Sequence, residues 1–157
     1  TSYVFPAQGE EPSESSRQTQ AKRGVVEQVA VDRAVNFEQE NRREPQVMPP
    51  KNEGYDILSM DDDGELRYIE VKGLNGTWSR ANPVLMTAAE HRFGRTKGGA
   101  YWLYVVENTA HPELTRLYAI EDPVNTIDRY AFDYGWQQFA HNEIDGEDTS
   151  RDDGEEE

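Results

Sequence analysis

Two short segments, GYDI at residues 54–57 and IEVKG at residues 69–73, decide how the sequence is interpreted. In each segment, charged residues interrupt an apolar run with strand character. A buried charge is costly unless it is paired with an opposite charge or binds a metal. Because alternate residues of a strand point to the same side, Glu70 and Lys72 are expected on one face. Pairing of the two segments as a hairpin would bring Asp56 beside them.

Two carboxylates and an ammonium group in one place suit metal-assisted hydrolysis of a phosphodiester bond. Carboxylate oxygens are hard ligands of the kind that Mg²⁺ prefers, and this ion keeps several waters when it binds. The predicted ligands are Asp56, Glu70 and the backbone carbonyl of Val71. The ion would polarise a phosphate oxygen and activate an attacking water. Lys72 would orient that water or stabilise the charge that develops on the phosphate.

The hydrophobic pattern of the remaining chain predicts a mixed α/β fold around one sheet. Apolar residues three and four apart predict a helix from Gly24 to about Asn41, which the prolines at 45, 49 and 50 end. Thr87 and Glu90 form a capping box, which predicts a second helix up to about residue 96. A last helical or irregular segment is expected at 122–139. The expected strands lie at residues 55–60, 66–72, 83–86, 100–106 and 114–120.

Composition divides the 157 residues into one domain and two flanking segments. Residues 1–20 are rich in Ser, Gln, Glu and Pro and are expected to be a disordered arm or linker. Residues 21–140 are expected to form the domain. Residues 141–157 contain nine acidic residues and one arginine, so they are predicted to be an acidic disordered tail.

The composition also limits the environment of the protein. The absence of cysteine excludes disulfides and thiolate metal sites, and no apolar run approaches the roughly 18 residues of a membrane span. The chain begins without a methionine or a signal peptide, so we expect a piece of a larger cytoplasmic protein.

The net charge of −15 counts against a simple nucleic-acid-binding module, since such modules are usually basic. The chain has 12 arginines and only four lysines. An acidic, lysine-poor surface suits a high-salt cytoplasm. It equally suits a GC-rich genome combined with an acidic tail, and the sequence leaves both explanations open.

An aspartate followed by Glu-x-Lys after a helix resembles the pattern of the PD-(D/E)XK nuclease superfamily. A longer stretch, residues 24 to 125, resembles the domain of unknown function at the C-terminus of the NO VEIN proteins. The matching blocks are the Gly-Tyr-Asp at 54–56, the Glu-Val-Lys-Gly at 70–73, Thr87 with Glu90, and the aromatic strand at 101–106. Tyr55 stands where the superfamily has a proline, which leaves the ligand set intact.

This resemblance implies a restriction-endonuclease-like mixed sheet flanked by helices. It implies a Mg²⁺- or Mn²⁺-dependent endonuclease, a hydrolase that acts on DNA in a restriction or defence system. It also implies a helicase or ATPase module in the same or a partner protein, and a homodimer is one arrangement of such nucleases. The superfamily often adds a glutamate from the first helix to the site. Glu27 is the candidate for that position and Glu38 is the substitute.

Several other polar residues have both a functional and a structural interpretation. A basic stripe on the second helix and two residues of the loop after the EVK strand are candidates for nucleic-acid contacts, or else for a solvated face and loop packing. These candidates are Arg92, Arg95, Lys97, Arg80 and Trp78. Glu90 is interpreted primarily as a capping residue, and a role in the site near the metal pocket is the alternative.

Two functions other than a nuclease are also compatible with the sequence. One is a nuclease-like fold that binds nucleic acid or a partner and no longer cleaves. The other is a protein-interaction module whose acidic tail contacts a basic partner.

Overall fold

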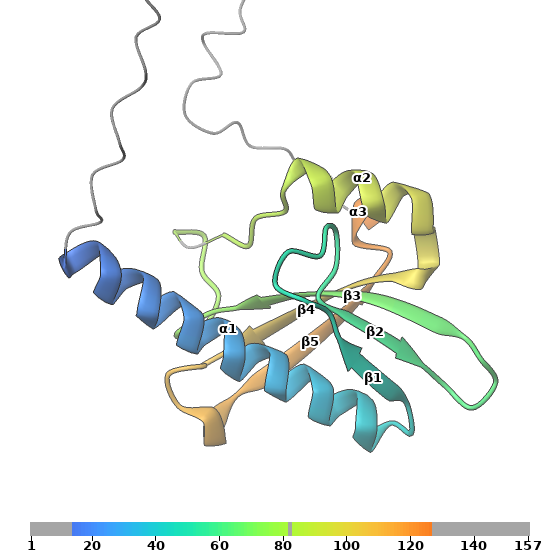
Figure 1. The fold of residues 1–157 in the computed structure, drawn as a ribbon, viewed down its shortest axis with the longest axis horizontal. Helices are drawn as coiled ribbons and strands as arrows, with labels where there is room; N and C mark the ends of the chain where they lie inside the picture. Colours follow the sequence, from blue (N-terminus) through green and yellow to red (C-terminus); the bar gives the residue numbers. More distant parts are fainter. Residues whose placement is uncertain (1–13, 82, 127–157) are drawn as a thin grey trace, which may run out of the picture. The chain divides into compact units, whose positions relative to one another are not determined.

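The computed structural model describes residues 14–81 and 83–126, which form a mixed α/β fold (Figure 1). One five-stranded sheet has the strand order β1-β2-β3-β4-β5, and its β3–β4 pair is parallel while the other pairs are antiparallel. The strands are β1 Glu44–Val47, β2 Ile57–Met60, β3 Leu66–Gly73, β4 Tyr101–Glu107 and β5 Arg116–Glu121. The helices are α1 Glu14–Glu40, α2 Ala88–Lys97 and α3 Pro123–Thr126.

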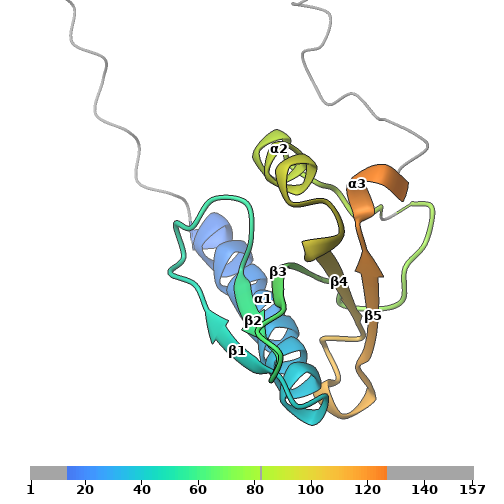
Figure 2. The ribbon, with the colours of Figure 1, turned by 90° about the vertical axis from the view of Figure 1, so that its right-hand side faces the viewer.

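The sheet combines a hairpin with one crossover. In the hairpin of β2 and β3, the Asp61 carboxylate accepts hydrogen bonds from the backbone N–H groups of Asp63 and Glu65, which confirms the turn expected there. Parallel strands need a long connection, usually helical. Here α2 lies in the connection from β3 to β4. The crossover therefore carries the α2 residues to the sheet face opposite α1 (Figure 2).

The main core lies between α1 and the sheet. Ala30 and Ala34 of α1 are fully buried, and their small side chains let the helix pack closely on Ile57, Ile69 and the β4 residues. The helix begins at Glu14, ten residues before the predicted start, so residues 14–20 of the expected arm are helical. Residues 1–13, the acidic tail and most of the expected last segment lie outside the described residues.

Two other predictions differ from the structure. Strand β1 was not predicted because Pro45 lies within it, but β1 is an edge strand, where a proline is tolerated. The strand predicted at residues 83–86 is wrong, since these residues lead into α2 without regular structure. The strands predicted at 100–106 and 114–120 are confirmed by β4 and β5. No helix in the described part of the chain is long and apolar enough to span a bilayer.

Candidate functional site

Two charged residues of β3 point to the face of the sheet on which α2 packs. Ile69 and Val71 belong to the core under α1, while Glu70 and Lys72 alternate with them and point to the other face. The Nζ atom of Lys72 lies 2.9 Å from Oε1 of Glu70. The prediction that these two residues face the same side of the strand is therefore confirmed.

Asp56 joins this pair from the residue before β2. Its backbone N–H donates to the carbonyl of Ile69, at 2.8 Å, and so ties the residue before β2 to strand β3. Its side chain turns toward β3, where Oδ2 accepts a hydrogen bond of 2.8 Å from the N–H of Val71. Asp56 and Glu70 are thereby brought together, as the sequence predicted.

An aromatic cluster fixes the backbone just before Asp56. Gly54 has a φ of +93°, and a Cβ atom at this position would lie 2.6 Å from Phe93 of α2. The hydroxyl of Tyr101 donates to the carbonyl of Gly54 at 2.9 Å. The ring of Tyr55 stacks on Phe93 with 5.0 Å between centroids. A glycine is required here both by its backbone conformation and by the close approach of the ring.

Glu90 is a member of the site as well as a capping residue. The capping box is confirmed, because Glu90 Oε2 accepts from the N–H of Thr87 and Thr87 Oγ1 accepts from the N–H of Glu90. Both carboxylate oxygens of Glu90 also lie 3.0 Å from Nζ of Lys72. Glu90 therefore caps α2 and also lies beside Lys72, the position that the alternative interpretation gave it. We call Asp56, Glu70, Lys72 and Glu90 the Glu70 cluster.

The electrostatics of the Glu70 cluster reflect three carboxylates around one ammonium group. Burial raises the pKa of Glu70 to about 8, and the charge of Asp56 adds to this rise while Lys72 opposes it. Burial also raises the pKa of Asp56, against the hydrogen bond from Val71. Burial opposes the charged form of Lys72, but Glu70 and Glu90 outweigh it and raise the Lys72 pKa. The cluster therefore has more negative charge than its own cation neutralises.

A cleft of about 1110 Å³ opens beside the Glu70 cluster. Its lining includes all four members of the cluster and Val71. Glu27 of α1 is exposed and also lines this cleft, so the structure places it where the sequence analysis expected a helix glutamate. Lys22 and Arg23 line the cleft as well, and sequence analysis did not single them out.

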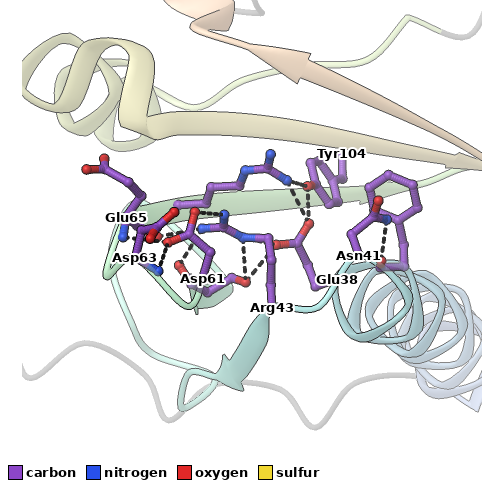
Figure 3. Close-up of polar contacts among 10 residues, drawn as sticks. Glu38, Asn41, Arg43, Asp61, Asp63, Glu65 and Tyr104 are labelled. Carbon is purple, nitrogen blue, oxygen red and sulfur yellow. Dashed lines mark hydrogen bonds and ion pairs between the residues drawn. The ribbon is translucent and has the colours of Figure 1, made fainter.

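Glu38, the substitute for Glu27, lies elsewhere in a second charged group shown in Figure 3. Its side chain is fully buried and forms ion pairs of 3.0 Å with Arg43 and 3.1 Å with Arg67. The same carboxylate accepts hydrogen bonds from the hydroxyls of Ser59 and Tyr104. We call these five residues the Glu38 cluster. Its carboxylate is neutralised within the fold, so Glu38 is a structural residue.

The predicted nucleic-acid contacts are placed away from the carboxylates. Arg92 and Arg95 are exposed on α2, and neither belongs to the described lining of the cleft. Lys97 lies over the ring of Tyr68, with Nζ 4.5 Å from its centroid, which is a cation–π contact.

The two predicted contact residues of the loop after β3 are also exposed. The backbone N–H of Trp78 donates to the side chain of Glu107 at 2.6 Å, and Trp78 lines a separate apolar groove on β4 and β5. Arg80 is exposed further along the same loop. The structure therefore does not bring Trp78 or Arg80 into the described lining of the cleft.

The Glu70 cluster offers carboxylate oxygens, which are the donor type that a hard divalent cation takes. In the described part of the chain, no three side chains of His, Cys, Asp or Glu are grouped so that they could hold a metal ion. The predicted set needs only two carboxylates and the Val71 carbonyl, since Mg²⁺ commonly binds through one or two carboxylates and retains waters. Burial raises the pKa of both Asp56 and Glu70, and a cation beside them would favour their charged forms.

The fold and the site define the class of this protein. It is an α/β domain whose five-stranded mixed sheet is flanked by helices, consistent with a restriction-endonuclease-like fold. The family model described as "Protein NO VEIN, C-terminal" matches residues 26–120, and the chain belongs to this family. The matched part includes the whole Glu70 cluster. No curated protein matches the chain, and neither does any solved structure.

Proposed function

We propose that this domain is a metal-dependent nuclease that hydrolyses phosphodiester bonds of DNA, as part of a larger restriction- or defence-type protein. The observation that carries the proposal is the convergence of Asp56, Glu70 and Lys72 at one cleft. In this proposal the domain acts inside the cell, beside a helicase or ATPase module in the same or a partner protein.

In the proposed reaction, the residues at the cleft have separate roles. Asp56, Glu70 and the carbonyl of Val71 are the groups that would hold Mg²⁺ or Mn²⁺, and Glu27 from the α1 wall would add a further oxygen. When bound, the ion supplies Lewis acidity toward a phosphate oxygen and lowers the pKa of a bound water. Lys72 lines the same cleft, and its ammonium group would stabilise negative charge on the phosphate.

Cleavage assays with matched variants test the proposed reaction. The wild type is expected to cut plasmid, single-stranded or modified DNA in Mg²⁺ or Mn²⁺. Asp56→Ala and Lys72→Ala are expected to lower the rate roughly 100-fold or more. Arg92→Ala, which removes an exposed charge outside the described cleft lining, is the control and should cut at the wild-type rate. Unchanged cleavage by Asp56→Ala and Lys72→Ala would mean that the site is wrongly assigned.

A second candidate function is a nuclease-like module that binds nucleic acid or a partner without cleaving it. It is favoured by Lys72, whose charge is already engaged by both Glu70 and Glu90. The absence of a three-side-chain metal group among the described residues points the same way. Such a module would use the cleft for recognition alone.

Calorimetric titration with Mg²⁺ and Mn²⁺, at low and high salt, separates the two functions. A nuclease site predicts metal binding by the wild type that is lost in Asp56→Ala and in Glu70→Ala. A binding module predicts no metal binding by the wild type, together with stoichiometric binding of nucleic acid. The same titration on Glu40→Ala, an exposed carboxylate at the far end of α1, controls for nonspecific binding to acidic residues.

A further inference from the structure

Helix α1 crosses the end of β3 at an unusually close contact. A Cβ atom on Gly73 would lie 2.9 Å from Cγ1 of Val26, 3.0 Å from the Val26 carbonyl oxygen and 3.1 Å from Cβ of Ala30. Only glycine leaves room for a helix backbone at this distance. Since Gly73 directly follows Lys72, this contact fixes one turn of α1 beside the end of β3 that carries the Glu70 cluster.

The geometry of an α-helix then determines where the preceding turn lies. Lys22 and Arg23 are four and three residues before Val26, so they lie on the same side of α1, one turn of about 5.4 Å further out. Both are exposed and line the cleft. Figure 1 shows these N-terminal turns of α1 extending past the end of β3. The two cations therefore form part of the cleft wall.

The charge of the cleft shows why these two positions matter. Among the residues that the structure describes, five acidic residues line it, namely Glu27, Glu53, Asp56, Glu70 and Glu90. The same described lining has three cationic residues, and Lys72 is ion-paired with two of these carboxylates. A nucleic-acid backbone is held mainly by contacts of lysine and arginine with its phosphates. Lys22 and Arg23 are the exposed cations of the lining that can make such contacts.

We propose that Lys22 and Arg23 form the phosphate-binding wall of the cleft and hold a nucleic-acid backbone next to the Glu70 cluster. The inference deepens the proposed function and rests on it for the choice of nucleic acid as the ligand. The inferred nucleic-acid-binding surface therefore lies on α1, whereas the sequence predicted it on the basic stripe of α2. Both residues precede Val26, so they also lie outside the part of the chain that matches the family.

Fluorescence anisotropy with a labelled DNA duplex tests this assignment on the full chain. The variant Lys22→Gln/Arg23→Gln is compared with Arg92→Gln/Arg95→Gln, which removes the same two charges from the exposed face of α2. Binding is measured over a salt series, with a chelator and separately with Ca²⁺. The α1 variant is expected to bind about 10-fold more weakly or worse, and its log–log salt slope should fall by about two, because each lost phosphate contact removes roughly 0.9. The α2 variant should bind within about twofold of the wild type.

Several results would overturn the inference. These are wild-type affinity in the α1 variant, an equal loss in the α2 variant, and no binding of nucleic acid by the wild type. Circular dichroism checks that both variants remain folded. A single-stranded RNA should show the same loss as DNA, since the contact is with phosphates, and a loss confined to one of them would contradict that contact. If the wild type binds nucleic acid through α1 but never cleaves it, the proposed nuclease function is wrong and the inference about Lys22 and Arg23 still holds.

Discussion

The Glu38 cluster and the Glu70 cluster are built from the same kinds of side chain on opposite faces of β3. In the Glu38 cluster, one fully buried carboxylate meets two guanidinium groups and two hydroxyls. In the Glu70 cluster, three carboxylates surround a single ammonium group at the wall of an open cleft. Cations thus outnumber carboxylates two to one in the Glu38 cluster, whereas carboxylates outnumber the cation three to one in the Glu70 cluster.

The difference between the clusters separates a structural from a functional use of buried charge. A carboxylate whose hydrogen bonds and charges are met within the fold has no need of a ligand. A pair of carboxylates with raised pKa values in a cleft, as Asp56 and Glu70 are, is a candidate for function, because a cation or proton from outside stabilises it. Four experiments test this distinction, taken from the largest expected effect to the smallest.

The largest effect is expected from Glu38→Gln. The substitution keeps the shape of the side chain but removes the only carboxylate described for Arg67 and leaves Arg43 with that of Asp61 alone, so the free energy of unfolding should fall by about 3–5 kcal/mol. Urea unfolding measures the change. Glu40→Gln, an exposed residue on the same helix, should change stability by less than about 0.5 kcal/mol. Equal stability of both variants would remove the structural role assigned to Glu38.

Tyr104→Phe removes one hydroxyl from the same cluster and leaves both arginines in place. A hydrogen bond to a charged group contributes about 1.5–3 kcal/mol, so the loss should be smaller than for Glu38→Gln. Burial and the Glu38 carboxylate both raise the pKa of Tyr104, so its hydroxyl remains a donor at neutral pH. Urea unfolding is again the measurement. Tyr118→Phe on β5, where the side chain is exposed, is the matched control and should be nearly neutral.

The stability contribution of Glu70 should respond to pH in the opposite sense to that of a carboxylate whose pKa is lowered, such as Glu90. The pKa of Glu70 is raised from 4.5 to about 8, so the folded protein keeps a proton that the unfolded chain has lost. The free energy of unfolding should therefore fall as pH rises from 4.5 to about 8, by roughly 1–2 kcal/mol where water in the cleft screens the repulsion.

Glu70→Gln isolates this contribution from those of other titrating groups. The variant has no carboxyl proton to lose, so its unfolding free energy should decline less over the same pH range. Chemical unfolding at several pH values measures both proteins side by side. Parallel pH profiles for wild type and variant would show that Glu70 is not destabilised by its surroundings.

The smallest effect is expected from Thr87→Ala, which removes the cap of α2. Loss of an N-cap side chain costs about 1 kcal/mol. Thr87→Ser retains the hydroxyl and should be close to the wild type. Thermal unfolding measures both. A Thr87→Ala protein as stable as the wild type would show that the two donors to the Glu90 carboxylate, Lys72 Nζ and the backbone N–H of residue 87, are enough to fix this end of α2.

Features that depend on neighbours in the sequence were predictable. The turn before β3, the capping box of Thr87 and Glu90, and the apolar strand β4 each have a local signature of a few residues. The pairing of Glu70 with Lys72 follows from the two-residue period of a strand. These elements needed no knowledge of which segment packs against which.

Features that depend on tertiary partners were not predictable. Val84 and Met86 suggested a strand, but they pack as irregular chain on Leu103 and Val105, so their apolar character reflects coverage of the sheet face. Pro45 predicted only the end of a helix, because the position of β1 at the sheet edge is a property of the whole fold. In both cases the local sequence is compatible with more than one backbone conformation, and the tertiary partners decide which one forms.

The site shows the same limit. Sequence spacing brought Asp56, Glu70 and Lys72 together, but it could not choose between Glu27 and Glu38, which lie on one helix. That choice depends on where α1 crosses the sheet. Glu38 follows Ala30 and Ala34 at intervals of four residues, which places it on the same side of α1, and Arg43 comes soon after the helix end. This spacing was the available sign that Glu38 is an internal ion-pair residue.

The missing side chain of Gly73 has a consequence for how the domain can be manipulated. Any larger residue there would act as a spacer between helix and sheet, because its first carbon would already meet Val26. One added methyl group would push the helical wall outward while every acidic and basic residue of the cleft kept its identity. The absence of a Cβ atom at Gly73 thus lets α1 lie close to β3. We expect Gly73→Ala to widen the cleft without changing its acidic and basic residues.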